Sequence, residues 1–335
     1  MNRILNIEDL HVSFDTYAGE VKAVRGVTLH VDEGEVLAIV GESGCGKSVT
    51  AQTVMRLNPE PPARIPAGAI TLCGHDIVRA SERELRSIRG KNVSMIFQDP
   101  MTCLNPTMPV GKQLVEAIRL HQKLSASEAK KKAVDLLKLV RIPNPEQRAK
   151  QYPHEFSGGM RQRVMIAMAL SCEPQLLIAD EPTTALDVTI QAQIMELLAD
   201  IREKTNTAII LITHDLGVVA GLANRVAVMY AGKVVETGAA GDIFYRGGHP
   251  YTQALLRSLP STETTRSEKL ISIPGAPPDL IAPPVGCPFA ARCEYAMKVC
   301  KEKMPPHFTL GEGHTAACWL HHEACPQRAK EVSAQ

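Results

Sequence analysis

Eight residues, from Gly41 to Ser48, combine glycines, a lysine and a hydroxyl group in a pattern suited to binding phosphate. The run reads Gly41-Glu42-Ser43-Gly44-Cys45-Gly46-Lys47-Ser48 and fits G-x4-G-K-[ST]. Glycines let successive backbone N–H groups curve around phosphate oxygens, while Lys47 would reach the β and γ phosphates and Ser48 would hold Mg²⁺. An apolar run, Val36 to Val40, precedes the loop, and a helix-compatible stretch follows it. The pattern predicts nucleotide binding; a purely structural glycine turn is the alternative.

Two adjacent carboxylates follow a second apolar run, Leu176 to Ala179. Asp180 would ligate Mg²⁺ directly or through water, and Glu181 would orient and deprotonate the water that attacks the γ-phosphate. An exposed strand end that happens to carry two acids is the alternative interpretation. A phosphate loop in the same chain favours the catalytic one.

Two more polar residues come directly after apolar runs. His214 follows Ala208 to Thr213, and it could hydrogen-bond the γ-phosphate because the carboxyl edge of an open parallel sheet collects ligands. Gln98 is the first polar residue after Val93 to Phe97. From position alone, a structural role explains either side chain as well as a functional one does.

A parallel sheet is needed to bring these residues together. Apolar runs rich in Val and Ile alternate with helix-compatible stretches, which predicts an α/β fold with a mostly parallel sheet. Between Gln98 and Gln175 helical spacing replaces the strand signals, so we expect a helical insert there. After Gly238 recurrent prolines interrupt any long element, which predicts a separate, loop-rich C-terminal extension.

Composition limits the classes of partner. The chain has 335 residues and 44% hydrophobic content, enough for a packed core. Its 37 Lys and Arg nearly cancel its 36 Asp and Glu, so no global field favours nucleic acid, and we expect no nucleic-acid partner. Apolar runs fall far short of the roughly 20 residues of a membrane-spanning helix, and the first ten residues show no secretory pattern, so we expect a cytoplasmic location.

A segment just upstream of the two carboxylates resembles the signature of ABC transporter ATPases. It reads Phe156-Ser157-Gly158-Gly159-Met160-Arg161-Gln162-Arg163, where the family usually has Leu-Ser-Gly-Gly-Gln. Phe156 and Met160 depart from that consensus, whereas the Ser-Gly-Gly core that contacts phosphate is intact. With the phosphate loop and Asp180-Glu181 in the family's order, the chain is identified as resembling this family over about residues 4 to 260.

The resemblance implies a P-loop ABC ATPase with a mixed β core. It divides the chain into a nucleotide-binding domain at 1–240, with a helical signature subdomain at about 99–170, and an extension at 241–335. Gln98 matches the Q-loop, where it would also ligate Mg²⁺, and His214 matches the catalytic switch. Asp187 closes the D-loop, Thr184-Ala185-Leu186-Asp187.

The resemblance also implies contacts with a second ATPase chain. In this family two nucleotide-binding domains clamp ATP head to tail, so Ser157, Gly158 and Gly159 would contact ATP held by the partner's phosphate loop. Adenine normally stacks on an aromatic residue upstream of the phosphate loop. Tyr17 is the candidate here, and Phe14 is the alternative.

Two segments, Ala179 to Gln193 and His249 to Leu256, resemble the ATPase subunits of peptide permeases, and Ser157 to Leu170 resembles their D-type subunit more than its F-type companion. The implied assembly is a heterodimer with an F-type ATPase beneath two transmembrane permease subunits, served by an extracytoplasmic peptide-binding protein. The chain would then lie peripherally on the cytoplasmic face of the membrane and drive di- or oligopeptide import. Alternatives are nickel, glutathione or glycoside cargo, a non-hydrolysing regulatory subunit, and a soluble ABC ATPase of translation or DNA repair.

Four C-terminal cysteines, Cys287, Cys293, Cys300 and Cys318, have the spacing C-x5-C-x6-C-x17-C. Thiolates gathered by a metal would supply folding energy to a proline-rich segment that cannot form a large core. All-thiolate ligation suits an iron–sulfur cluster or zinc, and unligated structural thiols are the third possibility. The permease resemblance implies a [4Fe-4S] cluster, with Cys325 left over.

Overall fold

The computed structural model describes residues 2–184, 186–258 and 273–325, and its strands form two sheets. The smaller sheet is antiparallel, in the order β2-β1-β4-β5. Its strands are β1 (Arg3–Thr16), β2 (Gly19–Asp32), β4 (Ala63–Leu72) and β5 (His75–Asp76). The sequence pattern did not predict this sheet, because its strands bury one face only and alternate apolar with polar residues.

The larger sheet carries eight strands in the order β11-β12-β10-β9-β3-β8-β7-β6. From β9 to β6 all neighbours pair in parallel, and β10, β12 and β11 continue the sheet antiparallel. The parallel strands are β3 (Val36–Val40), β6 (Val93–Ile96), β7 (Leu176–Asp180), β8 (Ala208–Thr213) and β9 (Arg225–Tyr230). This confirms the expected α/β fold with a mixed β core.

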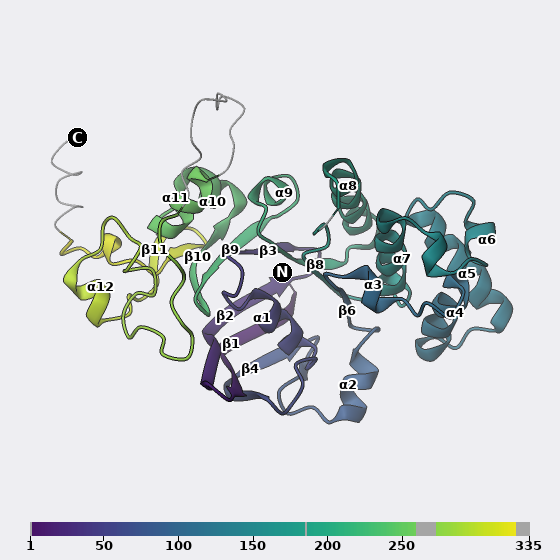
Figure 1. Cartoon of the computed structure of the whole chain (residues 1–335), viewed down its shortest axis with the longest axis horizontal. Helices are drawn as coiled ribbons and strands as arrows, with labels where there is room; N and C mark the ends of the chain where they lie inside the picture. Colours follow the sequence, from purple (N-terminus) through teal and green to yellow (C-terminus); the bar gives the residue numbers. More distant parts are fainter. Residues whose placement is uncertain (1, 185, 259–272, 326–335) are drawn as a thin grey trace.

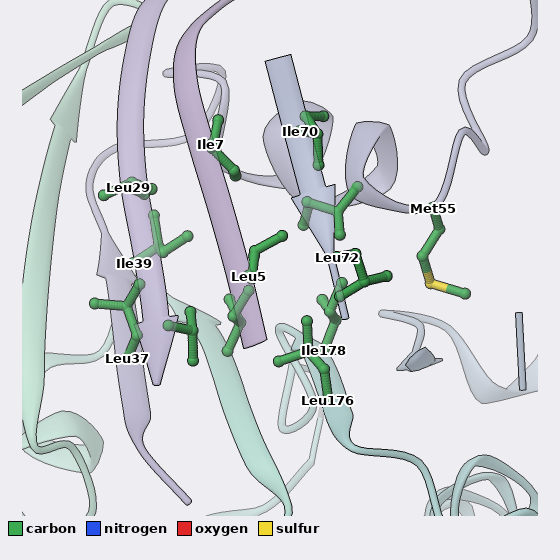
Figure 2. Packing of buried hydrophobic residues seen from close by; sticks show 14 of the residues in the cluster. Leu5, Ile7, Leu29, Leu37, Ile39, Met55, Ile70, Leu72, Leu176 and Ile178 are labelled. Atoms are coloured by element: carbon green, nitrogen blue, oxygen red, sulfur yellow. The ribbon is translucent and has the colours of Figure 1, made fainter. Parts of the chain in front are cut away.

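Alternate residues of each parallel strand enter different cores, which is why these strands read as continuous apolar runs. Leu37 and Ile39 of β3 pack between the two sheets, together with Leu5 of β1 and Leu72 of β4 (Figure 2). Val36 of the same strand belongs to a second core on the opposite face. Both faces of the central strands are therefore buried.

The second core is covered by the predicted helical insert and by α8 (Val188–Thr205). Two helices of the insert begin at serine caps: Ser125 forms a capping box with Glu128, and Ser157 caps α7. The insert contains α3 (Pro100–Cys103), α4 (Val110–His121), α5 (Ala126–Leu139), α6 (Pro145–Arg148), the 3-10 turn η1 (Pro153–Glu155) and α7 (Gly158–Leu170).

Shorter helices flank the rest of the sheet system. They are α1 (Lys47–Val54), α2 (Glu82–Ile88), α9 (Leu216–Ala220), α10 (Ala240–Arg246) and α11 (Pro250–Arg257). Helix α1 directly follows the glycine-rich loop, while α10 and α11 lead into the C-terminal extension.

The extension adds two strands to the edge of the central sheet. Its elements are α12 (Lys298–Glu302), β11 (Phe308–Gly311), β12 (His314–Ala316) and η2 (Trp319–His321), and β12 pairs with β10 (Lys233–Ala239). The carboxylate of Glu236, which is fully buried, accepts hydrogen bonds from the N–H groups of Gly248 and His249 and lies 2.8 Å from His314 Nε2. A region expected to be separate therefore shares the central sheet; the boundary at residue 240 stays a prediction.

The helical insert and the extension lie at opposite ends of the molecule, with α1 and the sheets between them (Figure 1). No helix among the described residues is long and apolar enough to cross a membrane. The predicted extension segments 259–272 and 326–335 lie outside the described residues.

Candidate nucleotide-binding site

The phosphate loop, Gly41–Ser48, leaves the end of β3 and enters α1. The Lys47 side chain is buried, and its ammonium donates hydrogen bonds to the carbonyl oxygens of Gly41 (2.8 Å) and Glu42 (3.0 Å). Gly41 has φ +153°, and a Cβ there would collide with the carbonyl oxygen of Met229. Gly46 has φ +99°, where a Cβ would lie 2.5 Å from the carbonyl oxygen of Ala23. Both positions need glycine because the loop passes so close to neighbouring backbone.

Oxygen ligands suited to Mg²⁺ meet beside this loop. The Ser48 hydroxyl donates a 2.8 Å hydrogen bond to Asp180 Oδ1, which joins the start of α1 to the end of β7. Burial raises the pKa of Asp180, and the bond from Ser48 opposes that shift. A hydroxyl and a carboxylate are the ligands that a hard divalent cation prefers, so these residues fit the predicted metal.

The Glu181 carboxylate contacts side chains that follow the two strands beside its own. Its Oε2 accepts hydrogen bonds from Gln98 Nε2 (3.2 Å) and Thr184 Oγ1 (2.8 Å), and its Oε1 lies 3.5 Å from His214 Nδ1. Gln98 follows β6, Glu181 follows β7 and His214 follows β8, and these strands are neighbours in the sheet. The structure thus brings together the three residues predicted to be catalytic.

Backbone geometry fixes the direction of the Glu181 carboxylate. Glu181 has φ +46°, a left-handed conformation that is uncommon for a side chain of this size. Its N–H group donates to the carbonyl oxygen of Ile212 on the neighbouring strand. Such locally strained residues occur at functional sites when the surrounding structure holds them.

The predicted signature residues and the D-loop residue Asp187 lie at two helix starts. Ser157 caps α7 by accepting from the N–H of Met160 (3.3 Å), and Asp187 caps α8 by accepting from Ile190 (3.0 Å). A Cβ on Gly158 would meet Leu186 Cδ2 at 4.0 Å, an ordinary van der Waals contact. A Cβ on Gly159, in contrast, would lie 2.8 Å from Ile190 Cγ2, so this glycine permits α7 to pack on α8. Ala185, within the predicted D-loop, lies outside the described residues.

The aromatic candidates for adenine differ in exposure. Tyr17 lies in the turn between β1 and β2, fully exposed. Phe14 lies on β1, half-buried against the core between the sheets. Tyr17 as the stacking residue stays a prediction.

The four C-terminal cysteines, Cys287, Cys293, Cys300 and Cys318, line one small, partly open cavity whose surface is apolar. Burial raises the pKa of Cys287 to about 11 and that of Cys318 to about 12, so both thiols are protonated at neutral pH. Among the described residues, no group of three or more His, Cys, Asp or Glu side chains is arranged to hold a metal ion. The cluster and zinc interpretations stay predictions, and Cys325 is buried outside this lining.

Sequence reasoning missed residues that complete the site. Thr184 was placed only as a member of the D-loop, yet its hydroxyl bonds Glu181. Arg292 and Tyr251, both from the C-terminal part of the chain, contact Glu42 in the phosphate loop. No local sequence pattern predicts a contact between Arg292 and Glu42, which are 250 positions apart. Arg292 does directly precede Cys293, one of the four cavity cysteines.

Two family models match the chain. One is described as "ABC transporter" and covers residues 24–184; the other, "Oligopeptide/dipeptide transporter, C-terminal region", covers residues 235–300. The first includes the phosphate loop and Glu181, and the second includes Arg292 and three of the four cavity cysteines, since it ends at residue 300. Both halves of the molecule therefore have counterparts in known proteins.

Similar proteins match along nearly the whole chain. The "Oligopeptide transport ATP-binding protein OppD" of Bacillus subtilis (strain 168) is 58% identical, covering 98% of this chain and 91% of that protein. The "Dipeptide transport ATP-binding protein DppD" of the same organism is 57% identical, covering 96% and 95%. Among solved structures, the dimeric ATP-binding cassette MJ0796 bound to ADP and Pi is 26% identical with a TM-score of 0.64, covering 70% of this chain and 98% of that one.

Proposed function

This chain belongs to the ABC transporter ATPases, among the ATP-binding subunits of oligopeptide and dipeptide transporters, and we propose that it hydrolyses ATP to drive import of short peptides. The observation that carries this proposal is the joint presence of two features. Glu181 follows β7 directly after Asp180, the residue that accepts a hydrogen bond from Ser48 of the phosphate loop. Gln98, Thr184 and His214 surround the Glu181 carboxylate. The extension matches the C-terminal region of peptide transporters.

Binding of ATP begins at the phosphate loop. Lys47 now donates to two carbonyl oxygens of its own loop, and these bonds are exchanged for phosphate oxygens when ATP enters. The loop's N–H groups and the start of α1 supply further donors to the phosphates. Ser48 and Asp180 would hold Mg²⁺, which neutralises charge on the β and γ phosphates.

Hydrolysis requires a base that orients one water molecule. Glu181 takes that role, and Gln98 and Thr184 each donate a hydrogen bond that fixes its Oε2 atom. His214, 3.5 Å from the other carboxylate oxygen, is then placed to donate to the γ-phosphate as charge develops there. Asp215 receives a bond from Gln191 of α8, which steadies the loop that carries His214.

A second ATPase chain completes the site. Ser157 and Gly158 are exposed at the start of α7, so they are free to meet ATP bound by another subunit. The solved cassette to which this chain is similar is dimeric. We propose a heterodimer with an F-type ATPase, placed peripherally on the cytoplasmic face of the membrane, beneath two transmembrane permease subunits that receive peptides from an extracytoplasmic binding protein.

ATPase activity of the assembly in lipid, with its binding protein, tests the cargo. Short peptides should stimulate hydrolysis several-fold, while nickel and glutathione should not. Hydrolysis that ignores peptides but rises with nickel or glutathione would contradict the peptide assignment and leave the ATPase assignment intact.

We also propose that the cysteine cavity holds a [4Fe-4S] cluster. Its support is the shared apolar cavity of four thiols and an orphaned polar atom: His249 is among the residues that line this cavity, and its buried Nε2 has no hydrogen-bond partner among the described residues. His249 Nδ1 accepts from the N–H of Tyr251, so the proton of the neutral ring is on Nε2, which is free to donate to sulfur. The cluster would bind four thiolates, one at each iron, and tie the extension together. These four cysteines include no C-x2-C pair, which argues against a zinc ribbon.

Chemical analysis separates the three possibilities for the cysteines. Protein purified without oxygen should contain about four irons and four acid-labile sulfides per chain. Stoichiometric zinc, or four free thiols with no metal, would contradict the cluster.

A further inference from the structure

An ion pair joins the phosphate loop to the C-terminal extension. Arg292 Nη1 lies 2.7 Å from Glu42 Oε2, and its Nη2 lies 2.9 Å from Glu42 Oε1. The guanidinium therefore forms a bidentate ion pair with the carboxylate. The Arg292 side chain is only 5% exposed and that of Glu42 25%, so water screens this pair far less than a surface pair.

The arginine is itself held in place by other groups. Its guanidinium donates to the Tyr230 hydroxyl (3.1 Å) and to the carbonyl oxygens of Pro274 (2.8 Å) and Ile273 (3.2 Å). It also lies 5.8 Å from the ring centre of Tyr230 and 5.9 Å from that of Phe289. These partners hold the guanidinium of Arg292 in one orientation toward Glu42. A side chain held in this way can position another residue.

The backbone of Glu42 is fixed as well. Its N–H group donates a 2.8 Å hydrogen bond to the hydroxyl of Tyr251, a fully buried residue of α11, and its carbonyl oxygen accepts from Lys47. The side chain, N–H and carbonyl of Glu42 are therefore all engaged. Two of these three contacts come from the C-terminal part of the chain, and the third comes from the lysine that must reach the phosphates.

Charge gives this contact a functional consequence. Glu42 places a carboxylate in a loop that has to accept the polyanionic triphosphate, and an unpaired carboxylate there would repel it. The guanidinium of Arg292 neutralises that carboxylate. We propose that Arg292 is a positioning residue for ATP binding: its guanidinium neutralises the Glu42 carboxylate and holds it in one place, so that this carboxylate does not repel the triphosphate bound by the loop.

The inference extends the ATP-binding role of the family and does not depend on the peptide cargo or on the cysteine cavity. A cassette that ended at β10 would lack this contact, because Arg292, Tyr251 and the carbonyl groups of 273 and 274 all follow it in the chain. The extension is thereby part of the ATP site. If peptides fail to stimulate hydrolysis, the proposed role of Arg292 is unaffected. If Arg292→Ala leaves KM for ATP unchanged, the peptide assignment is unaffected.

ATP binding by the full chain tests the inference, with a fluorescent ATP analogue for affinity and steady-state hydrolysis for KM and kcat. Arg292→Ala should weaken affinity and raise KM for ATP about tenfold, which corresponds to about 1.4 kcal/mol, while kcat changes less than about threefold. The matched control is Arg257→Ala, another arginine of the C-terminal part, whose pair with Glu294 is exposed. It should leave KM unchanged.

A double variant separates positioning from general loss of structure. In Arg292→Ala with Glu42→Gln the repelling charge is gone, so affinity should return to within about threefold of the wild type. Arg292→Lys keeps the charge but loses the fork, so KM should rise about threefold, and this variant serves if Arg292→Ala fails to fold. Unchanged KM in a folded Arg292→Ala or in Arg292→Lys, or a double variant as weak as Arg292→Ala, would overturn the inference.

Discussion

The phosphate loop and the cysteine cavity of the same chain are built in opposite ways. In the loop, polar groups have partners before any ligand arrives: Lys47 bonds two carbonyl oxygens and Ser48 bonds Asp180. In the cavity, the walls are apolar, and the buried Nε2 of His249 has no partner among the described residues. Lys47 and Ser48 of the first site have partners as folded, whereas the second site keeps a buried nitrogen without one among the described residues.

The difference indicates where each site obtains its stability. The loop rests on the central sheet and needs no ligand to keep its shape, so ATP can bind and leave without unfolding it. The cavity is surrounded by short elements joined by proline-rich segments, which bury little apolar surface of their own. A group bound by four thiolates would then supply folding free energy there.

The rate of hydrolysis should depend on the residues at the carboxyl edge of the parallel strands and not on the cysteine cavity. Glu181→Gln keeps the shape of the side chain but removes the base, so the hydrolysis rate should fall at least about a hundredfold while ATP affinity stays within about twofold. Single-turnover hydrolysis and binding of a fluorescent ATP analogue measure the two quantities. Glu196→Gln, a change at an exposed glutamate of α8, is the control and should leave both unchanged. Retention of more than a tenth of the rate in Glu181→Gln would contradict the assignment.

The phosphate loop should tolerate a methyl group at one glycine and not at another. Gly41→Ala combines a disfavoured φ with a collision against the backbone of Met229, so we expect about 3 kcal/mol less stability. Gly44→Ala has a similar φ problem, at +78°, but open space around it, so the loss should be about 1 kcal/mol. Melting temperatures without nucleotide measure this difference. Equal losses in the two variants would show that backbone packing does not define the loop.

The cysteine cavity should affect stability before it affects ATP. Cys318→Ala should abolish iron and sulfide content and destabilise the extension by about 2 kcal/mol, with ATP affinity within about twofold of the wild type. Limited proteolysis of the extension and analogue binding provide the readouts. Cys172→Ala, at a half-buried cysteine after α7, is the control and should keep the metal content. Selective loss of hydrolysis in a fully folded Cys318→Ala would break the separation between the two regions.

The hydroxyl of Tyr251 should make a small contribution where the two regions meet. Tyr251→Phe leaves the N–H group of Glu42 without its partner, which should cost about 1 kcal/mol of stability and weaken ATP binding two- to threefold. Differential calorimetry and analogue binding measure both effects. Tyr245→Phe, at an exposed tyrosine of α10, should change neither. An unaltered melting temperature in Tyr251→Phe would mean that water replaces the hydroxyl.

Local patterns in the sequence were enough to predict the parallel strands, the helical insert and the phosphate loop. Each of these depends on residues close together in the chain: apolar runs buried on both faces, helical spacing, and glycines with lysine at fixed intervals. Gln98, Glu181 and His214 were expected at the carboxyl edge of a parallel sheet, and the family resemblance assigned their roles; the strand order that places them together came from the structure. The antiparallel sheet was missed because β1 and β2 alternate in polarity and gave no long apolar run.

Only the tertiary structure decided how the extension relates to the rest. Pairing of β12 with β10, burial of Glu236 among partners from two segments, and the ion pair of Arg292 with Glu42 all join residues far apart in the chain. Such contacts produce no periodic pattern in the sequence, because they join residues that are distant in the chain and adjacent only in the folded structure. The sequence by itself determined that this chain binds and hydrolyses ATP; the fold decided that its C-terminal region reaches back to the phosphate loop.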